Sequence, residues 1–150
     1  MRVVVQRVLE SDVSVNGNVI GKIGPGLCIF FGVKSGDSYD EMDWLINKIV
    51  NLRIFSDEHG KMNKSVQDID GEILVISQFT LYASTRKGNR PSFIEAEKPE
   101  RAEKFYNSFV ENLQKKLGKT IQTGEFGGDM KINIVNDGPV TILIDTELKW

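Results

Sequence analysis

The sequence has 150 residues, 40% of them hydrophobic and 27% charged, which is the size and composition of one globular domain, so we expect residues 1–150 to fold as a single unit. The net charge of −2 provides no global field that would attract phosphate, which restricts any contact with nucleic acid to a local patch. No apolar stretch approaches the roughly 20 residues of a membrane-spanning helix, and the first residues do not resemble a signal peptide, so we expect a cytoplasmic protein without membrane contact.

The first 33 residues predict β-structure. Segment 1–8 is rich in β-branched residues, and Val13 and Val15 alternate with polar residues up to Asn16-Gly17, a strong hairpin signal. Residues 19–23 return along this hairpin, and Gly24-Pro25-Gly26 interrupts the chain before an apolar segment at 27–33. We therefore expect four consecutive strands arranged as a meander.

Two helices are expected after these strands. Ser38-Tyr39-Asp40-Glu41 fits a capping box, and apolar residues follow at helical spacing, which predicts a helix near 38–52. A second helical pattern starts near Pro99 and ends at Gly118. Both apolar stripes indicate faces that pack against a core rather than cofactor-binding faces.

The remaining patterns predict further strands at 73–77, 120–125, 131–135 and 140–146, with a polar loop at 83–92. Strands and two helices without regular βαβ alternation favour an α+β fold. We expect a mainly antiparallel sheet, barrel-like or sandwiching, with both helices on one face.

The scarcity of cysteine and histidine limits the possible chemistry. Cys28 lies in an apolar run that indicates a buried strand, and His59 lies in a polar turn. One residue of each type excludes a Cys/His metal cluster and argues against a catalytic triad based on histidine. We therefore expect no metal and no cofactor, and a hydrolytic reaction would need another source of a base.

Two segments break the local patterns. In Ser77-Gln78-Phe79-Thr80-Leu81 an apolar strand runs into hydroxyl and amide groups, followed by a loop that carries Arg86, Lys87 and Arg90. These residues have two interpretations. The residue types alone favour an ordinary strand end followed by a solvated loop, and the alternative is a ligand site with phosphate contacts.

The second segment is Asn136-Asp137-Gly138-Pro139-Val140-Thr141, in which a proline interrupts an apolar strand pattern. Proline removes a hydrogen-bond donor from a sheet, and an X-Pro bond is the only peptide bond for which the cis form is inexpensive. Spacing alone favours a hairpin turn here.

Together with the opening Met1-Arg2-Val3-Val4-Val5-Gln6-Arg7-Val8, these two segments resemble the hallmark sequences of the D-aminoacyl-tRNA deacylase family. The resemblance extends from the first residue to about Thr146. It implies a homodimer with active sites at the subunit interface and no metal or organic cofactor. It also implies that the Gly138-Pro139 bond is cis and enters the partner subunit's active site as a chirality filter.

The resemblance assigns roles to individual residues as well. Ser77, Gln78, Phe79 and Thr80 would line the pocket for the aminoacylated 3′-terminal adenosine of tRNA. Around the filter, Arg7 would fix the Gly138-Pro139 loop, with Asn136 beside it, and Met130 would border the site. Contacts of Arg86, Lys87 and Arg90 with tRNA phosphates are expected from charge alone.

The expected activity is hydrolysis of the ester bond of D-aminoacyl-tRNA and of mischarged Gly-tRNA, with rejection of L-aminoacyl-tRNA. Because no histidine, lysine or carboxylate flanks Thr80 in the sequence, assistance by the vicinal ribose hydroxyl of the substrate is favoured over a Thr80 nucleophile. The alternative is a non-enzymatic nucleic-acid-binding homodimer that uses Arg86, Lys87 and Arg90, with Lys115, Lys116 and Lys119.

Overall fold

One long strand, β1 (Arg2–Val15), organises the sheet of the computed structural model, which describes residues 1–149. Strand β8 (Met130–Asp145) pairs antiparallel along one edge of β1. Along the other edge, β3 (Gly26–Gly32) pairs with the first half of β1, and β2 (Asn18–Ile23) pairs with the second half. The opening segment therefore contains three strands and no meander, because β3 turns back to β1 instead of pairing with β2.

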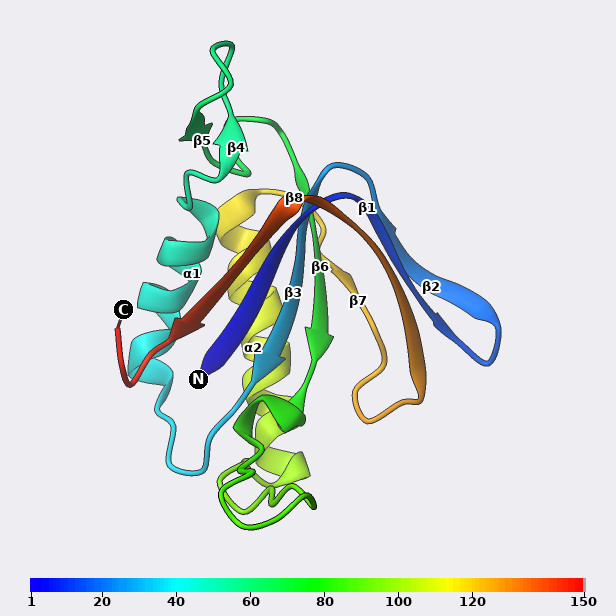
Figure 1. Ribbon diagram of the computed structural model, residues 1–150, viewed down its shortest axis with the longest axis vertical. Helices are drawn as coiled ribbons and strands as arrows, with labels where there is room; N and C mark the ends of the chain where they lie inside the picture. The colour runs from blue at the N-terminus through cyan, green and yellow to red at the C-terminus, as the bar shows by residue number, and fades with distance from the viewer. Residues whose placement is uncertain (150) are drawn as a thin grey trace.

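The sheet continues with parallel strands. β6 (Glu72–Ser77) pairs parallel with β3, and β7 (Gln122–Thr123) pairs parallel with β6. Parallel neighbours need a long connection, and here each connection contains a helix. The α+β class and the barrel-like shape are confirmed, and the sheet is mixed and nearly closed (Figure 1). Most of it is antiparallel, as expected, because all three pairings of β1 are antiparallel, while β3–β6 and β6–β7 add parallel pairings.

The expected break in the last strand is also wrong. β8 runs through residues 130–145 without a hairpin turn, and its register against β1 shifts between Gln6 and Glu10. The peptide bond between Gly138 and Pro139, opposite this irregularity, is cis. Among the described residues β8 pairs only with β1, so it is an edge strand, which can accommodate a proline and a bulge.

The helices agree well with the sequence pattern. The 3₁₀ helix η1 (Tyr39–Glu41) leads into α1 (Met42–Val50), and the Ser38 hydroxyl accepts a hydrogen bond from the Asp40 backbone at 3.2 Å. Helix α2 (Pro99–Leu117) ends at Gly118, whose φ of 73° is the left-handed conformation that glycine adopts readily. Two short strands, β4 (Phe55–Ser56) and β5 (Met62–Lys64), form a separate hairpin, and the 3₁₀ helix η2 (Phe79–Tyr82) follows β6.

Both helices cover one face of the sheet and enclose the main core (Figure 1). Phe31 of β3 stacks on Phe109 of α2 with ring centroids 4.3 Å apart. A smaller apolar cluster fills the barrel side of the sheet and includes Cys28, whose burial raises the pKa of the thiol to about 11. His59 is exposed in the β4–β5 turn, as expected. In the described part of the chain, no helix is both long and apolar enough to cross a membrane.

Candidate active site

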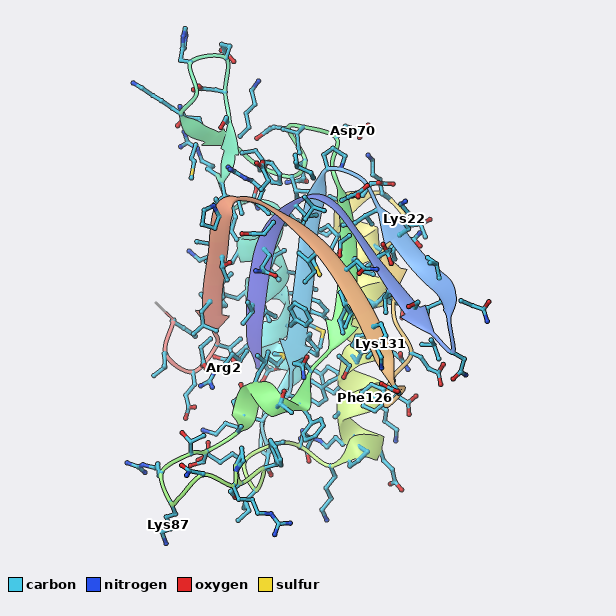
Figure 2. All side chains as sticks on the ribbon, turned by 45° about the vertical axis from the view of Figure 1, so that its right-hand side comes forward. Arg2, Lys22, Asp70, Lys87, Phe126 and Lys131 are labelled. Carbon is cyan, nitrogen blue, oxygen red and sulfur yellow. The ribbon has the colours of Figure 1, made fainter. Side chains whose placement is uncertain are left out.

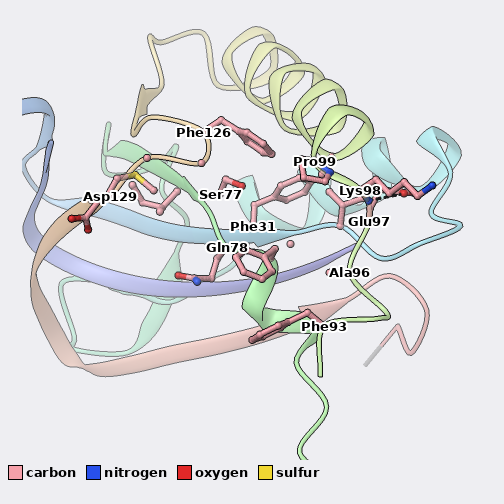
Figure 3. A pocket seen from close by; sticks show the side chains of 18 of the residues that line it. Phe31, Ser77, Gln78, Phe93, Ala96, Glu97, Lys98, Pro99, Phe126 and Asp129 are labelled. Carbon is pink, nitrogen blue, oxygen red and sulfur yellow. Dashed lines mark hydrogen bonds between the residues drawn. The ribbon is translucent and has the colours of Figure 1, made fainter. Parts of the chain in front are cut away.

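A cavity of about 660 Å³ opens at the carboxyl end of β6, a volume suited to one drug-sized ligand (Figure 3). Four segments line it: the end of β3 (31–33), the corner between β6 and η2 (76–79), residues within 93–102 that lead into α2, and the loop into β8 with its first residues (126–132). Ser77, Gln78, Phe79 and Met130 all contribute to this lining. The structure thus brings four of the expected site residues together.

The corner between β6 and η2 forms where a buried apolar strand meets polar residues. Residues 73–76 are buried, and the Gln78 backbone then donates a hydrogen bond to the Phe31 carbonyl at 2.8 Å. The chain passes so close to Gly32 that a Cβ there would lie 3.0 Å from the Gln78 carbonyl oxygen. η2 begins immediately, and neither the Phe79 nor the Thr80 backbone N–H has an acceptor within residues 1–149. These two groups remain without a protein acceptor beside the cavity.

Within residues 1–149, Thr80 has no partner that could activate it. Its hydroxyl accepts a hydrogen bond from the Gln78 side-chain amide at 2.5 Å, and the residue is exposed and outside the cavity lining. An amide is not a base, so this contact orients the hydroxyl without increasing its nucleophilicity.

The carboxylate of Glu97 also lines the cavity, and sequence analysis did not identify it. Burial alone would raise the pKa of Glu97, but hydrogen bonds from the Lys98 backbone and the Arg101 side chain hold this pKa below its usual range. Glu97 is therefore an ionised partner of Arg101 and a poor candidate for a general base. Over the described residues, no group of three or more His, Cys, Asp or Glu side chains could hold a metal ion.

Two aromatic residues of the cavity lining, Phe93 and Phe126, come from segments that sequence analysis did not assign to the site. Phe93 follows the polar loop and meets Phe79 edge to face, with centroids 5.0 Å apart. Phe126 lies on another side of the cavity (Figure 3), in the glycine-rich segment 124–128. An aromatic residue beside a polar loop or a glycine cluster was the only signal available for either residue.

The Gly138-Pro139 segment does not lie at this cavity. Asn136 is paired with Val8 of β1, Val8 with Gly26 of β3, and Gly26 with Glu72, the first residue of β6. Asn136 and Glu72 therefore lie at the same level of the sheet. Ser77 is five residues further along β6, or roughly 16 Å at about 3.3 Å per residue. In Figure 1, the bend of β8 lies at the upper end of the sheet, and η2, which follows β6, lies at the lower end.

Arg7 and Asn136 instead brace the Gly138-Pro139 segment. Arg7 donates hydrogen bonds to the carbonyls of Asp137 at 3.0 Å and Ile54 at 2.5 Å. The Asn136 amide donates to the carbonyls of Arg7 and Val140, both at 3.0 Å. These contacts hold both flanks of the segment.

The polar loop at residues 83–92, called the basic loop below because it carries Arg86, Lys87 and Arg90, extends away from the cavity (Figure 2). Its base is closed by two backbone hydrogen bonds between Ser84 and Ser92, of 2.8 and 2.9 Å. Arg86, Lys87 and Arg90 are exposed, and within residues 1–149 they make no ion pair; Figure 2 shows Lys87 at the end of the loop. In contrast, Lys115 and Lys119 pair with Glu111 and Asp70.

The fold and the cavity thus define an α+β unit with a pocket of hydroxyl, amide and aromatic groups at the carboxyl end of β6. A family model described as D-Tyr-tRNA(Tyr) deacylase matches residues 4–145. D-aminoacyl-tRNA deacylases of Flavobacterium johnsoniae and Bacteroides fragilis (strain NCTC 9343) are 53% and 55% identical, over 98% and 99% of both chains. The chain belongs to the D-Tyr-tRNA(Tyr) deacylase family, and the enzyme class predicted from the sequence is confirmed.

Two solved structures share the fold of this chain. The structure of a c-Myc DNA unwinding element binding protein superposes with a TM-score of 0.92 at 47% identity and covers 97% of this chain and 98% of that chain. A probable eukaryotic D-amino acid tRNA deacylase superposes with a TM-score of 0.81 at 16% identity, over 95% of this chain and 97% of that chain. The second likeness supports the fold alone.

Proposed function

We propose that this enzyme hydrolyses the ester bond of D-aminoacyl-tRNA and releases free tRNA and a D-amino acid in the cytoplasm. The observation that carries the proposal is the cavity beside Ser77, Gln78 and Phe79, which has the size of an aminoacylated nucleoside-like ligand and adjoins two available backbone N–H groups. The names of the relatives support the same substrate class.

In the proposed mechanism a water molecule attacks the ester carbonyl. The backbone N–H groups of Phe79 and Thr80 donate to the developing oxyanion, and one such donor is typically worth about 3–4 kcal/mol of barrier. The vicinal ribose hydroxyl orients the water and relays its proton to the departing ribose oxygen. Assistance by the substrate is consistent with the absence of an activating partner for Thr80 and with the ion pair between Glu97 and Arg101.

We further propose that the backbone of Gly138 and Pro139 provides selectivity. Carbonyl oxygens of a braced backbone cannot swing aside as a side chain can, so an L side chain directed at them is rejected. A D side chain points away from them, and glycine has no side chain to reject. The contacts of Arg7 and Asn136 support this role because they restrict the movement of the segment.

Because the Gly138-Pro139 segment and the cavity lie at different levels of the sheet within one chain, we propose that the enzyme is a homodimer. If each Gly138-Pro139 segment enters the partner subunit's cavity, one two-fold interface completes two equivalent sites. In that complex Arg86, Lys87 and Arg90 contact phosphates of the tRNA.

A non-enzymatic nucleic-acid-binding role is the second candidate, favoured by the name of the DNA unwinding element binding protein to which this chain is 47% identical. The pairing of Lys115 and Lys119 with carboxylates weakens it, because these lysines then offer little net charge to phosphate.

Parallel assays of D-Tyr-, L-Tyr-, L-Ala- and Gly-tRNA test the proposed function. We expect turnover of D-Tyr-tRNA, measurable cleavage of Gly-tRNA and sparing of both L-substrates. Binding of tRNA without release of any amino acid would reject the enzymatic function. Comparable cleavage of D- and L-Tyr-tRNA would reject the backbone filter.

A further inference from the structure

The cavity is large enough for one aminoacyl nucleoside but not for the nucleotides that precede it in the tRNA. The single-stranded 3′ end must therefore leave the cavity across one side of its mouth. Charge distinguishes the sides, since phosphates follow positive potential.

Residues 73–94, on the side of η2 and the basic loop, contain three cations (Arg86, Lys87 and Arg90) and no acidic residue. Residues 120–131, on the side of β7 and the start of β8, contain Glu125 and Asp129 with only Lys131 as a cation. The approach to α2 mixes Glu95 and Glu97 with Lys98. A polyanion is accordingly directed over the Phe79–Phe93 side.

This side also offers aromatic surface. Phe79 and Phe93 are 54% and 39% exposed, although their rings contact each other. The ring of Phe93 lies between the cavity and the basic loop, on a different side from Asp129 (Figure 3). Exposed aromatic rings next to cations form the usual surface for single-stranded nucleic acids, on which bases stack while cations contact the backbone.

We propose that Phe93 is the stacking platform for the nucleotide that precedes the terminal adenosine, which in tRNA is a cytidine. The inference rests on the proposed function and deepens it by assigning the exit path of the substrate. Phe79 braces the ring of Phe93 from its edge, and the basic loop receives the phosphates further along the strand.

The test compares D-tyrosyl esters of adenosine and of the dinucleotide CpA. For the unaltered protein, the added cytidine raises kcat/KM. In Phe93→Ala this gain falls about tenfold, which is the size of one lost stacking contact, whereas Phe93→Tyr keeps it. Ile94→Ala is the matched control, because Ile94 is the next residue, is apolar and is 89% exposed, and it also keeps the gain.

A second arm replaces the penultimate cytidine of D-Tyr-tRNA by an abasic nucleotide. This change costs the unaltered protein about tenfold in kcat/KM and costs Phe93→Ala little. Equal losses in both proteins, or an unchanged gain from cytidine in Phe93→Ala, overturn the proposal. If the unaltered protein cleaves neither D-tyrosyl adenosine nor D-Tyr-tRNA, the proposed function itself is rejected.

Discussion

Arg7 contacts Asp137 twice: its Nε donates to the Asp137 carbonyl at 3.0 Å and lies 3.1 Å from the Asp137 carboxylate. The same guanidinium donates to the Ile54 carbonyl, so β1, β8 and the segment before β4 are joined at one side chain. Arg7 is 8% exposed, which makes these bonds costly to break.

Arg7→Met should therefore destabilise the protein by about 2–3 kcal/mol, because two carbonyls lose a charged donor. It should also reduce the preference for D-Tyr-tRNA over L-Tyr-tRNA, since the filter segment becomes mobile. The matched control is Arg53→Met, which removes comparable bonds to Asn63 on the exposed β4–β5 hairpin. Urea unfolding and paired assays measure both effects, and unchanged selectivity in Arg7→Met would contradict the bracing role.

Gly138→Ala should impair the filter more directly. A Cβ at this position would lie 2.7 Å from the backbone nitrogen of Val140, and the φ of 145° disfavours any side chain. Gly17→Ala provides the control, because its φ of 79° is also strained for alanine but nothing lies within 4 Å of the added atom. We expect both variants to lose stability and only Gly138→Ala to lose at least about tenfold in kcat/KM for D-Tyr-tRNA. Equal activity of the two variants would argue against a role for Gly138 in the site.

Local signals predicted the elements whose determinants lie within a few residues. Pro99 and Gly118 marked both ends of α2, and Asn16-Gly17 marked the turn between β1 and β2. The parallel pairing of β3, β6 and β7 depends on where the helices carry the chain, and no local pattern contains that information. Exposed Leu9 and Glu10 interrupt the alternation of β1 near its irregular register, which explains why one strand resembled two.

The candidate site was predicted in the same uneven way. Ser77, Gln78 and Phe79 stood out because polar groups follow an apolar strand, and the structure places them on the cavity. Phe93 and Phe126 could not be joined to them, because segments distant in sequence meet only in the folded chain. The distance between the cavity and Gly138 also follows from strand register, which single-sequence patterns do not specify.

The ion pair of Arg2 with Asp145 should make stability depend on pH. Burial alone would raise the pKa of Asp145, but hydrogen bonds from Arg2 and from the backbone of Glu147 and Leu148 hold it below its usual range. A carboxyl whose pKa is lower in the folded state stabilises the fold above its unfolded pKa of about 3.9, and this stabilisation is lost as pH falls through the folded pKa.

Asp145→Asn should therefore cost about 2–3 kcal/mol at pH 7, and the cost should shrink below about pH 4. Thermal unfolding of both proteins from about pH 7 to about pH 2.5 measures this difference. The exposed pair of Glu111 and Lys115 is the control, and Glu111→Gln should have no measurable effect at either pH. A constant difference across the pH range would show that the Asp145 charge is unimportant.

Thr80→Ala should retain D-Tyr-tRNA hydrolysis within about threefold, because among the described residues the Thr80 hydroxyl is hydrogen-bonded only to the Gln78 amide, which cannot act as a base. Removal of the vicinal ribose hydroxyl from the substrate should reduce kcat by at least about a hundredfold, as expected for a lost catalytic group. Single-turnover rates separate chemistry from binding. Loss of turnover in Thr80→Ala together with normal cleavage of the 2′-deoxy substrate would establish Thr80 as the nucleophile.

The final prediction concerns which chain supplies Gly138 to each cavity. One chain carries Gly138→Ala and has an intact cavity, and the other carries Gln78→Trp, which fills the cavity mouth and leaves the filter intact. If the segment acts across the dimer, a mixed dimer contains one complete site, formed by the first chain's cavity and the second chain's filter. If the segment acts within its own chain, the mixed dimer contains none.

Random assembly of equal amounts gives about half mixed dimers, so the mixture should recover roughly one quarter of the unaltered specific activity. Gly138→Ala alone should retain at most about a tenth of it, and Gln78→Trp alone should be inactive. Light scattering should give about twice the 16.9 kDa of one chain for every sample. The two variants are refolded together in one sample, and in a second sample they are mixed after folding, when they do not exchange subunits. Recovery of activity in the first sample but not in the second assigns the activity to the mixed dimer. A mass of one chain at working concentration, or no recovery in a verified mixed dimer, would show that the cavity and the Gly138-Pro139 segment do not form a site across two subunits.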